Sequence, residues 1–211
     1  VVTFSGLGLK ISALLISISG GHVWLALIMV MLCCIVLGMG MPTTAAYIIA
    51  AVLMAPTLIS LGFHPLAAHM FVFYFACLSM VTPPVALAAY ASAGISESDP
   101  MKTGFLAWML ALNGFLIPFA FVQNNALLMM GSWTEILVVT FFTMIGVYSL
   151  AKAIISNKLP KKLRFLFAIA AILLIDPKLL TSITGIIVLA AGLMIQKKIE
   201  SAKQRTADVN V

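Results

Sequence analysis

A long stretch almost without charge constrains this chain more than any other feature of its sequence. Between Lys10 and Glu135 the only charged side chains are Glu97, Asp99 and Lys102. Charged residues make up 9% of the 211 residues and hydrophobic residues 63%, and the mean hydropathy is +1.18. Soluble domains carry about 25% charged residues. A soluble fold would have too few polar side chains for its surface, so we expect an integral membrane protein.

The apolar runs are continuous, which favours helices over a barrel whose strands would alternate apolar and polar residues. We therefore expect an all-α integral membrane fold. Its predicted parts are an amphipathic arm helix in residues 1–21, a re-entrant hairpin in 22–60, a broken transmembrane helix in 61–94, two transmembrane helices in 95–151, and a basic loop, helical hairpin and polar tail in 152–211.

Two details of this plan have alternatives. The arm helix, 4–19, is expected to lie along the membrane surface, and the alternative is the end of a spanning helix. Residues 163–196 either cross the membrane twice or dip into it and return. The polar tail, 197–211, is expected to be disordered.

Two of the apolar runs are interrupted at the depth of the bilayer centre. The run GMGMPTT (38–44) joins two arms, 22–38 and 43–60, each a little short of the ~20 residues that a spanning helix needs. These arms predict a hairpin that enters and leaves on the same face. In 66–94 the tripeptide Thr-Pro-Pro (82–84) removes backbone donors and unwinds the helix. Backbone groups freed at this depth must face protein or a water-holding cavity.

The two breaks form the candidate site. Glycine lets the backbone approach closely, and exposed carbonyls can coordinate sodium. Threonine hydroxyls and helix N-terminal N–H groups can hold a carboxylate, and Thr43 and Thr44 are placed to cap the second arm. The competing interpretation is a plain proline kink between packed helices. The predicted substrate- and ion-binding residues are Gly38, Gly40, Pro42, Thr43, Thr44, Ser79, Thr82, Pro83 and Pro84, with sodium held by the backbone around Gly38, Gly40 and Thr82.

Other chemistries find little support. No nucleophile has a recognisable acid–base partner, so no enzyme is expected, and no cofactor beyond sodium as the coupling ion. His22, His64 and His69 lack metal-site spacing and are interpreted as interfacial or packing residues. The three cysteines lie in apolar runs and predict no disulfide. The net charge of +6 comes from residues that flank apolar segments, so anionic lipid is a better partner for it than nucleic acid.

The basic residues also orient the chain, because loops rich in Lys and Arg stay in the cytoplasm. The cluster in 152–164 is then cytoplasmic, and helix 104–129 runs from inside to outside. The broken segment 66–94 runs from outside to inside, and the hairpin 22–60 opens to the outer face.

Three runs resemble the large membrane subunit of tripartite ATP-independent periplasmic (TRAP) transporters, above all the fused permease type. They are LGMGMPTTAAYIIAAVLMAP, HPLAAHMFVFYF and SMVTPPVALAAYASAGI, and the resemblance is strong over residues 4–129. It implies an elevator-type, sodium-coupled secondary transporter, multi-pass in the bacterial inner membrane. Such a transporter takes up organic acids, chiefly carboxylates, delivered by a periplasmic substrate-binding protein.

The resemblance also implies that this chain is the second inverted repeat (arm helix, re-entrant hairpin and broken helix) with additional C-terminal transmembrane helices. The expected partners are the remaining N-terminal permease half or a small membrane subunit, and the lipid bilayer.

Three positions depart from the pattern of many unfused large subunits of this family. Those subunits carry aspartate, asparagine and glycine at the positions where this chain has Pro42, Phe75 and Ser79, respectively. These departures indicate a site built from backbone groups and hydroxyls. The alternative functions are an ion channel or passive pore, and a structural membrane subunit without a site of its own.

Overall fold

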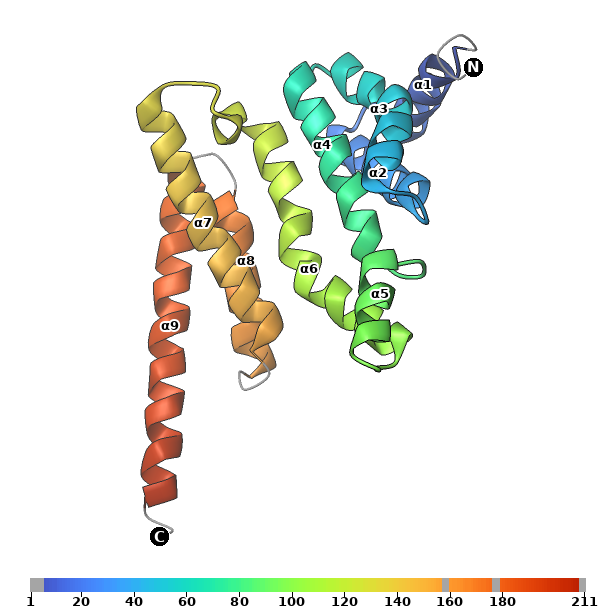
Figure 1. Cartoon of the computed structure of the whole chain (residues 1–211). Coiled ribbons are helices and arrows are strands. Elements are labelled where there is room, and N and C mark those ends of the chain that lie inside the picture. The colour runs from blue at the N-terminus through green and yellow to red at the C-terminus, as the bar shows by residue number, and fades with distance from the viewer. Residues whose placement is uncertain (1–5, 157–159, 176–178, 209–211) are drawn as a thin grey trace. The chain divides into compact units, whose positions relative to one another are not determined.

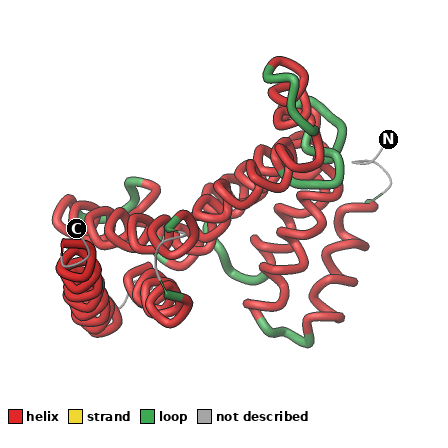
Figure 2. The backbone as a smooth tube through the Cα atoms, turned by 90° about the horizontal axis from the view of Figure 1, so that it is seen from below, coloured by secondary structure: helices red, strands yellow, loops and turns green. Residues whose placement is uncertain are grey.

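The computed structural model describes residues 6–156, 160–175 and 179–208, and all regular structure in these ranges is helical (Figures 1 and 2). The chain divides into two compact units, Val1–Leu128 and Met129–Val211. The helical class predicted from the continuous apolar runs is therefore confirmed for the described residues.

The first unit contains the hairpin and the broken helix. Its helices are α1 (Leu7–Ser19), α2 (Val23–Gly38), α3 (Thr43–Ser60), α4 (Pro65–Leu78), the short η1 (Ser79–Val81), α5 (Leu87–Ile95), α6 (Pro100–Gln123) and η2 (Asn125–Leu128). Helix α3 packs against α1, α2 and α4, and α6 packs along α4 and α5. The hairpin tip and the interruption of the long segment fall where the glycine and proline residues predict them.

Local sequence signals set several of these boundaries. The Asp99 carboxylate accepts the Lys102 N–H at 2.8 Å and caps α6, whose first residue is Pro100. The His64 ring accepts the Leu66 N–H at 3.2 Å and caps α4 in the same way. His64 therefore acts as a helix-capping residue, and whether it lies at the membrane interface stays a prediction.

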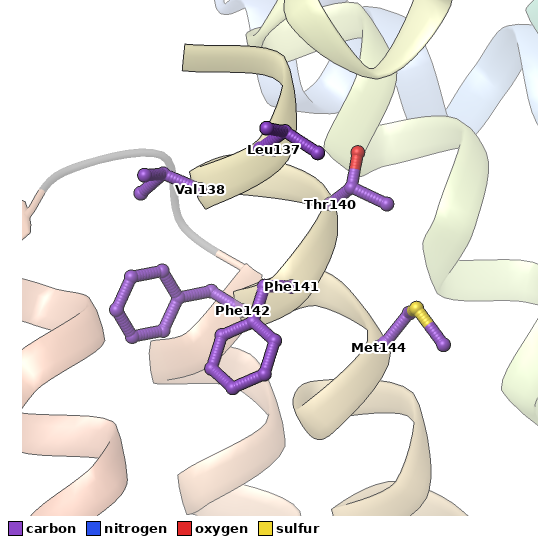
Figure 3. A pocket seen from close by; sticks show the side chains of 6 residues that line it. All are labelled: Leu137, Val138, Thr140, Phe141, Phe142 and Met144. Carbon is purple, nitrogen blue, oxygen red and sulfur yellow. The ribbon is translucent and has the colours of Figure 1, made fainter. Parts of the chain in front are cut away.

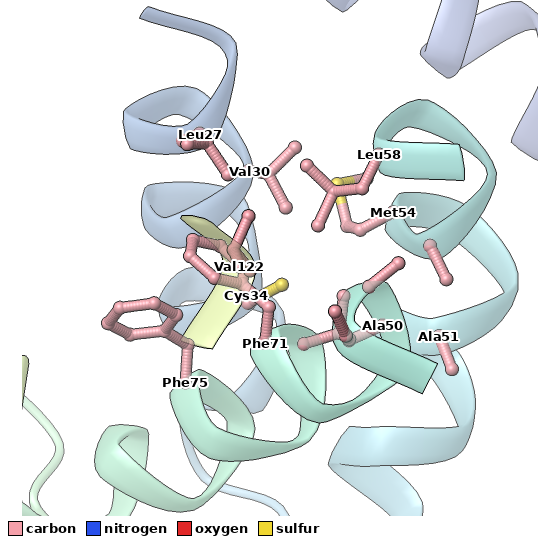
Figure 4. Close-up of a cluster of buried hydrophobic side chains, with 14 of the residues drawn as sticks. Leu27, Val30, Cys34, Ala50, Ala51, Met54, Leu58, Phe71, Phe75 and Val122 are labelled. Carbon is pink, nitrogen blue, oxygen red and sulfur yellow. The ribbon is translucent and has the colours of Figure 1, made fainter. Parts of the chain in front are cut away.

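A cluster of buried hydrophobic side chains forms the core of the first unit, and Phe71 and Phe75 belong to it (Figure 4). Phe71 and Phe75 on α4 are fully buried, with ring centroids 4.8 Å apart. The Phe119 ring of α6 packs edge-on against both, at 5.3 Å and 5.9 Å, and stacks on Trp24 of α2 at 6.3 Å. Close packing of this kind is what holds helices together where lipid removes the hydrophobic drive to associate.

Helix α1 turns its small residues toward the protein. Ser12 and Ser19 are buried, whereas Leu9 and Leu14 are exposed. Lys10 and Ser17 are also exposed, and Leu15 is buried. Whether this helix lies along the membrane surface or ends a spanning helix stays a prediction.

A proline in α3 explains where α1 packs. The helix continues through Pro56 to Ser60 rather than ending there. Because Pro56 has no N–H, the carbonyl of Val52 loses its helical partner. Gly8 of α1 sits against this carbonyl, and a Cβ placed on Gly8 would lie 2.6 Å from Val52 O. The glycine therefore lets a second helix cover the freed backbone oxygen.

The described residues of the second unit form α7 (Trp133–Ile155), α8 (Lys161–Ile175) and α9 (Leu179–Asp208). Helix α8 packs between α7 and α9. The buried Ser149 hydroxyl of α7 donates to the Phe167 carbonyl of α8 at 2.8 Å. A Cβ on Gly185 of α9 would lie 2.7 Å from Leu174 Cγ, so this glycine sets the close approach of α9 to α8.

The prediction of a disordered tail is wrong as far as Asp208, because α9 continues to that residue. Residues 197–208 are rich in Lys, Glu, Ala, Gln and Arg, which are strong helix formers, and a preceding helix supplies the nucleus they need. Polarity alone predicted disorder and overlooked this propensity. Residues 209–211 lie outside the described residues.

Three helices of the described chain are long and apolar enough to cross a membrane: Thr43–Ser60, Pro100–Gln123 and Trp133–Ile155. Shorter apolar helices are Leu7–Ser19, Val23–Gly38 and Pro65–Val81. The two arms of the hairpin thus differ, since only the second reaches spanning length. Whether the hairpin re-enters the face it came from stays a prediction.

We predict that Gly8→Ala destabilises the packing of α1 on α3. The added methyl group overlaps the Val52 carbonyl, and overpacking of this kind costs about 1–3 kcal/mol. Thermal unfolding of the purified chain in detergent measures the loss. The matched control is Gly94→Ala in α5, where nothing lies within 4 Å of the new Cβ and stability is expected to be retained. Equal melting temperatures for both variants would contradict the proposed contact.

Candidate functional site

The hairpin tip is a tight turn between two helix ends. Helix α2 ends at Gly38, and α3 begins at Thr43. Gly40 has φ +77°, a left-handed conformation that glycine adopts without steric cost. Pro42, with φ −57° and ψ 145°, leads into the first turn of α3. The glycine and the proline therefore account for the reversal of the chain at the tip.

The second break is an unwound segment between two helices. Helix α4 tightens into η1, residues 82–86 leave the helix, and α5 begins at Leu87. The peptide bond between Pro83 and Pro84 is cis, and Ala86 has φ +25°. The predicted break at 82–84 is thus present and extends two residues further.

The structure brings the two breaks into direct contact. A Cβ placed on Gly38 would overlap the Ser79 hydroxyl and lie 2.9 Å from Ser79 Cβ and 3.3 Å from the Ala76 carbonyl oxygen. A Cβ on Gly40 would lie 3.8 Å from Val85 Cγ1. The last turn of α2 therefore sits against η1, and the hairpin tip sits against the unwound segment.

Two hydroxyls of the break donate hydrogen bonds to backbone carbonyls at the C-terminal end of α4. Ser79 Oγ donates to the Ala76 carbonyl at 2.7 Å, and Thr82 Oγ1 donates to the Leu78 carbonyl at 2.7 Å. Each hydroxyl has a single proton and two acceptor lone pairs. Since the protons are used within the helix, the oxygen lone pairs of the half-buried Thr82 remain as acceptors.

The helices that leave the breaks have no side-chain cap. The N-cap position of α3 is Pro42, so the prediction that Thr43 and Thr44 cap this arm is wrong. Pro42 occupies the N-cap position, so both threonines lie inside the first turn. From there their hydroxyls do not accept hydrogen bonds from the free N–H groups of that turn. Helix α5 likewise starts after Ala86 without a side-chain cap. Both helices present first-turn N–H groups.

The predicted threonines of the tip do not join the break. Thr43 is half-buried and Thr44 is exposed, and within the described part of the chain neither hydroxyl makes a hydrogen bond. Pro84 is also exposed. Among the predicted residues, the contact between Gly38 and Ser79 is therefore the one that joins the tip to the break.

Sequence reasoning missed Tyr90, which holds the unwound segment in place. Its hydroxyl donates to the Pro84 carbonyl at 2.6 Å. Gly104 of α6 makes room for the ring, because a Cβ there would lie 2.9 Å from Tyr90 Cε1. The signal in the sequence was a single aromatic residue in the small-residue run AAYASAG that follows the prolines.

A further polar contact links the hairpin to α4. The Tyr47 hydroxyl of α3 lies 3.1 Å from Nδ1 of His69, and the Tyr47 ring packs edge-on against Phe73 at 5.4 Å. His69 thus packs against the hairpin, as its sequence interpretation proposed. No three His, Cys, Asp or Glu side chains of the described residues come together as a metal site.

Two apolar hollows are lined by other residues than those of the predicted site. One, of about 510 Å³, follows a face of α7 and is lined by Leu137, Val138, Thr140, Phe141, Phe142 and Met144 (Figure 3). The other, of about 330 Å³, lies among α1, α2 and α3 and is lined by Ile11, Leu32, Cys33, Val36, Leu37, Leu53 and Met54. Neither contains a residue of the predicted site.

Comparison with known proteins identifies a family for this chain. A family model described as the tripartite ATP-independent periplasmic transporter, DctM component, matches residues 1–136. The chain belongs to the DctM family. DctM proteins are membrane components of transporters, and the match covers every helix of the first unit, including both breaks. No curated protein and no solved structure matches the chain.

The structure explains one departure of this DctM chain from the family pattern. Phe75 stands where the resemblance implies an asparagine in many unfused large subunits, and here it is fully buried against the rings of Phe71, Phe115 and Phe119. A polar side chain at this position would have no partner among those rings. Phe75 is therefore a core residue in this DctM protein.

We predict that Gly38→Ala in this DctM chain lowers stability by about 1–3 kcal/mol, because the methyl group overlaps Ser79. Ser79→Gly removes the obstructing atoms and is expected to restore much of the loss in the double variant. Thermal unfolding of the four proteins in detergent gives the coupling energy. Additive effects of the two substitutions would show that the residues do not touch.

We also predict that Tyr90→Phe loosens residues 82–86 without disturbing the cluster around Phe71. The variant loses one hydrogen bond to the Pro84 carbonyl, worth about 1 kcal/mol. Amide hydrogen exchange read over 82–95 and over 66–76 is expected to accelerate in the first segment alone. Unchanged exchange in both segments would contradict the role of the hydroxyl.

Proposed function

We propose that this chain carries part of the transport site of a sodium-coupled secondary transporter, which moves an organic acid, a carboxylate, across the bacterial inner membrane. Membership of the DctM family supports TRAP-type transport. The observation that supports a site at the breaks is the contact between Gly38 and Ser79, which joins two interrupted helices.

The cation is proposed to bind where helix C-termini meet. Helices α2 and α4 both end at this contact, and helix C-termini carry partial negative charge. Thr82 Oγ1 offers lone pairs, and in the described hydrogen bonds the carbonyls of Val81 and Pro83 accept none. Oxygen atoms of this kind are the ligands that hard cations prefer, and unwound helices supply them to sodium.

The substrate carboxylate is proposed to bind where helix N-termini lie. The first turns of α3 and α5 have no side-chain cap, so their N–H groups are available to an anion. Residues 38–44 and 79–86 contain no Asp, Glu, Lys or Arg. A site of partial charges avoids the cost of burying a full charge in the membrane while the site is empty.

The partners and motion follow from the family resemblance. A periplasmic substrate-binding protein is proposed to deliver the acid, and the remaining N-terminal permease half or a small membrane subunit to complete the permease. The arm helix, hairpin and broken helix are proposed to be the second inverted repeat, and the permease to be multi-pass and to work by an elevator movement.

Sodium-dependent uptake by the intact permease tests this proposal. Thr82→Val is expected to raise the sodium concentration for half-maximal uptake about tenfold or more, because a hydrogen-bonding or coordinating group that meets a charge is worth about 1.5–3 kcal/mol. Thr82→Ser keeps the hydroxyl and is expected to keep the sodium dependence.

Thr57→Val is the matched control for this experiment. Thr57 is 0% exposed in α3, and its hydroxyl has no hydrogen-bond partner, so valine fits without leaving a polar group unpaired. This variant is expected to transport normally. If Thr82→Val also left the sodium dependence unchanged, the cation would not bind at the breaks.

A further inference from the structure

Basic side chains gather at one end of the second unit. Arg164 lies in the first turns of α8, and its guanidinium reaches the last turn of α7. Helix α9 runs antiparallel to α8, with Gly185 against Leu174 and Gly192 against Phe167. The same pairing places Lys197 of α9 at the level of Lys162 along the axes of the two helices. We call Lys152, Lys161, Lys162, Arg164 and Lys197 the basic end.

Arg164 differs from the lysines of the basic end in having protein partners. Its Nε donates to the Ala153 carbonyl at 2.7 Å and its Nη2 to the Ile154 carbonyl at 3.0 Å. These are carbonyls of the last turn of α7, which has no further helical donors. Arg164 therefore caps the C-terminus of α7, and its guanidinium is not part of the proposed ligand site.

The exposed lysines of the basic end have no such role. Lys161, Lys162 and Lys197 are exposed. The helix dipole disfavours cations in the first turn of α8, so helix stability does not explain Lys161 and Lys162. Among the described side chains of this unit, the one carboxylate is that of Glu135 in the first turn of α7. It lies about 25 Å from Lys152 along the helix, so it does not neutralise the lysines.

An apolar stripe on α7 leads to the basic end. Leu137, Phe141, Met144 and Tyr148 recur at helical spacing and are all more than half exposed. The first three line the hollow of about 510 Å³ in Figure 3. The stripe ends at Lys152, whose Nζ lies 5.8 Å from the centroid of the Tyr148 ring and 5.4 Å from that of Phe167.

The dimensions of this surface fit one leaflet of a bilayer. Phe141 and Lys152 are about 16 Å apart along the helix axis. Half of the hydrocarbon core is about 15 Å thick. A phospholipid whose chain lies along the stripe thus has its phosphate at the level of the lysines.

We propose that the second unit binds an anionic phospholipid, with its phosphate on Lys161, Lys162 and Lys197 and an acyl chain along the α7 stripe. Charge complementarity selects an anionic headgroup, and the length of the stripe selects a lipid over a free anion. Lys152 stands at the boundary between the two parts of the ligand. This site lies outside the part of the chain that carries the transport breaks.

Lipid retention by the purified full chain in detergent tests the proposal. Native mass spectrometry counts bound phosphatidylglycerol against phosphatidylcholine at equal concentration. The wild-type chain is expected to retain phosphatidylglycerol preferentially. Combined K161Q, K162Q and K197Q is expected to weaken that retention at least tenfold, since each lysine near an anionic surface contributes about fivefold. The triple Lys→Arg variant keeps the charge and is expected to retain the lipid.

K102Q is the matched control, because Lys102 is also an exposed lysine in the first turn of a helix, but beside the Asp99 carboxylate. It is expected to bind phosphatidylglycerol as the wild type does. Circular dichroism establishes that the Lys→Gln variant keeps its helices. Equal retention of both lipids, or unchanged retention in that variant, overturns the proposal. Displacement by millimolar inorganic phosphate also overturns it, since the ligand would then be a free anion.

Discussion

The structure of the first unit depends on how backbone polar groups are satisfied away from water. Glycine and proline interrupt two otherwise apolar segments, at the hairpin tip and after η1, and Pro56 removes one hydrogen bond inside the continuous α3; each of these changes frees N–H or C=O groups. The hydroxyls of Ser79 and Thr82 donate to carbonyls at the end of α4, and the Tyr90 hydroxyl donates to the Pro84 carbonyl inside the unwound segment. Among the described hydrogen bonds the carbonyls of Val81 and Pro83 accept none, and the proposed ion site rests on these oxygens together with the hydroxyl of Thr82.

Glycines from neighbouring helices accompany each interruption. Gly8 covers the carbonyl released by Pro56, Gly38 sits on Ser79, and Gly104 accommodates the tyrosine that binds Pro84. In each case a side chain as small as a methyl group would already collide with its neighbour. Small residues are how helices in lipid come close enough to pack, and here they do so at the points where the backbone most needs cover. The interruptions and the close contacts are therefore two parts of one arrangement.

Local sequence signals predicted the positions of the elements well and their contacts poorly. The turn at Gly40 and the unwinding at Pro83 and Pro84 follow from single residues, so both could be located in advance. The pairing of Tyr90 with Gly104 joins two helices through space, and no periodicity in either helix announces it. The capping role expected of Thr43 failed because Pro42 competes for the same position. The tail up to Asp208 is helical and not disordered, because its residues are good helix formers; the prediction considered only their polarity.

The contact between Gly38 and Ser79 has a consequence for how the hairpin and the broken helix are coupled. Together with the approach of Gly40 to Val85 and the link between Tyr47 and His69, it fastens the hairpin to α4 and its unwound end. Separating the tip from the unwound segment would break these contacts together. A displacement of the hairpin is therefore transmitted to the end of α4, and a displacement of α4 is transmitted to the hairpin.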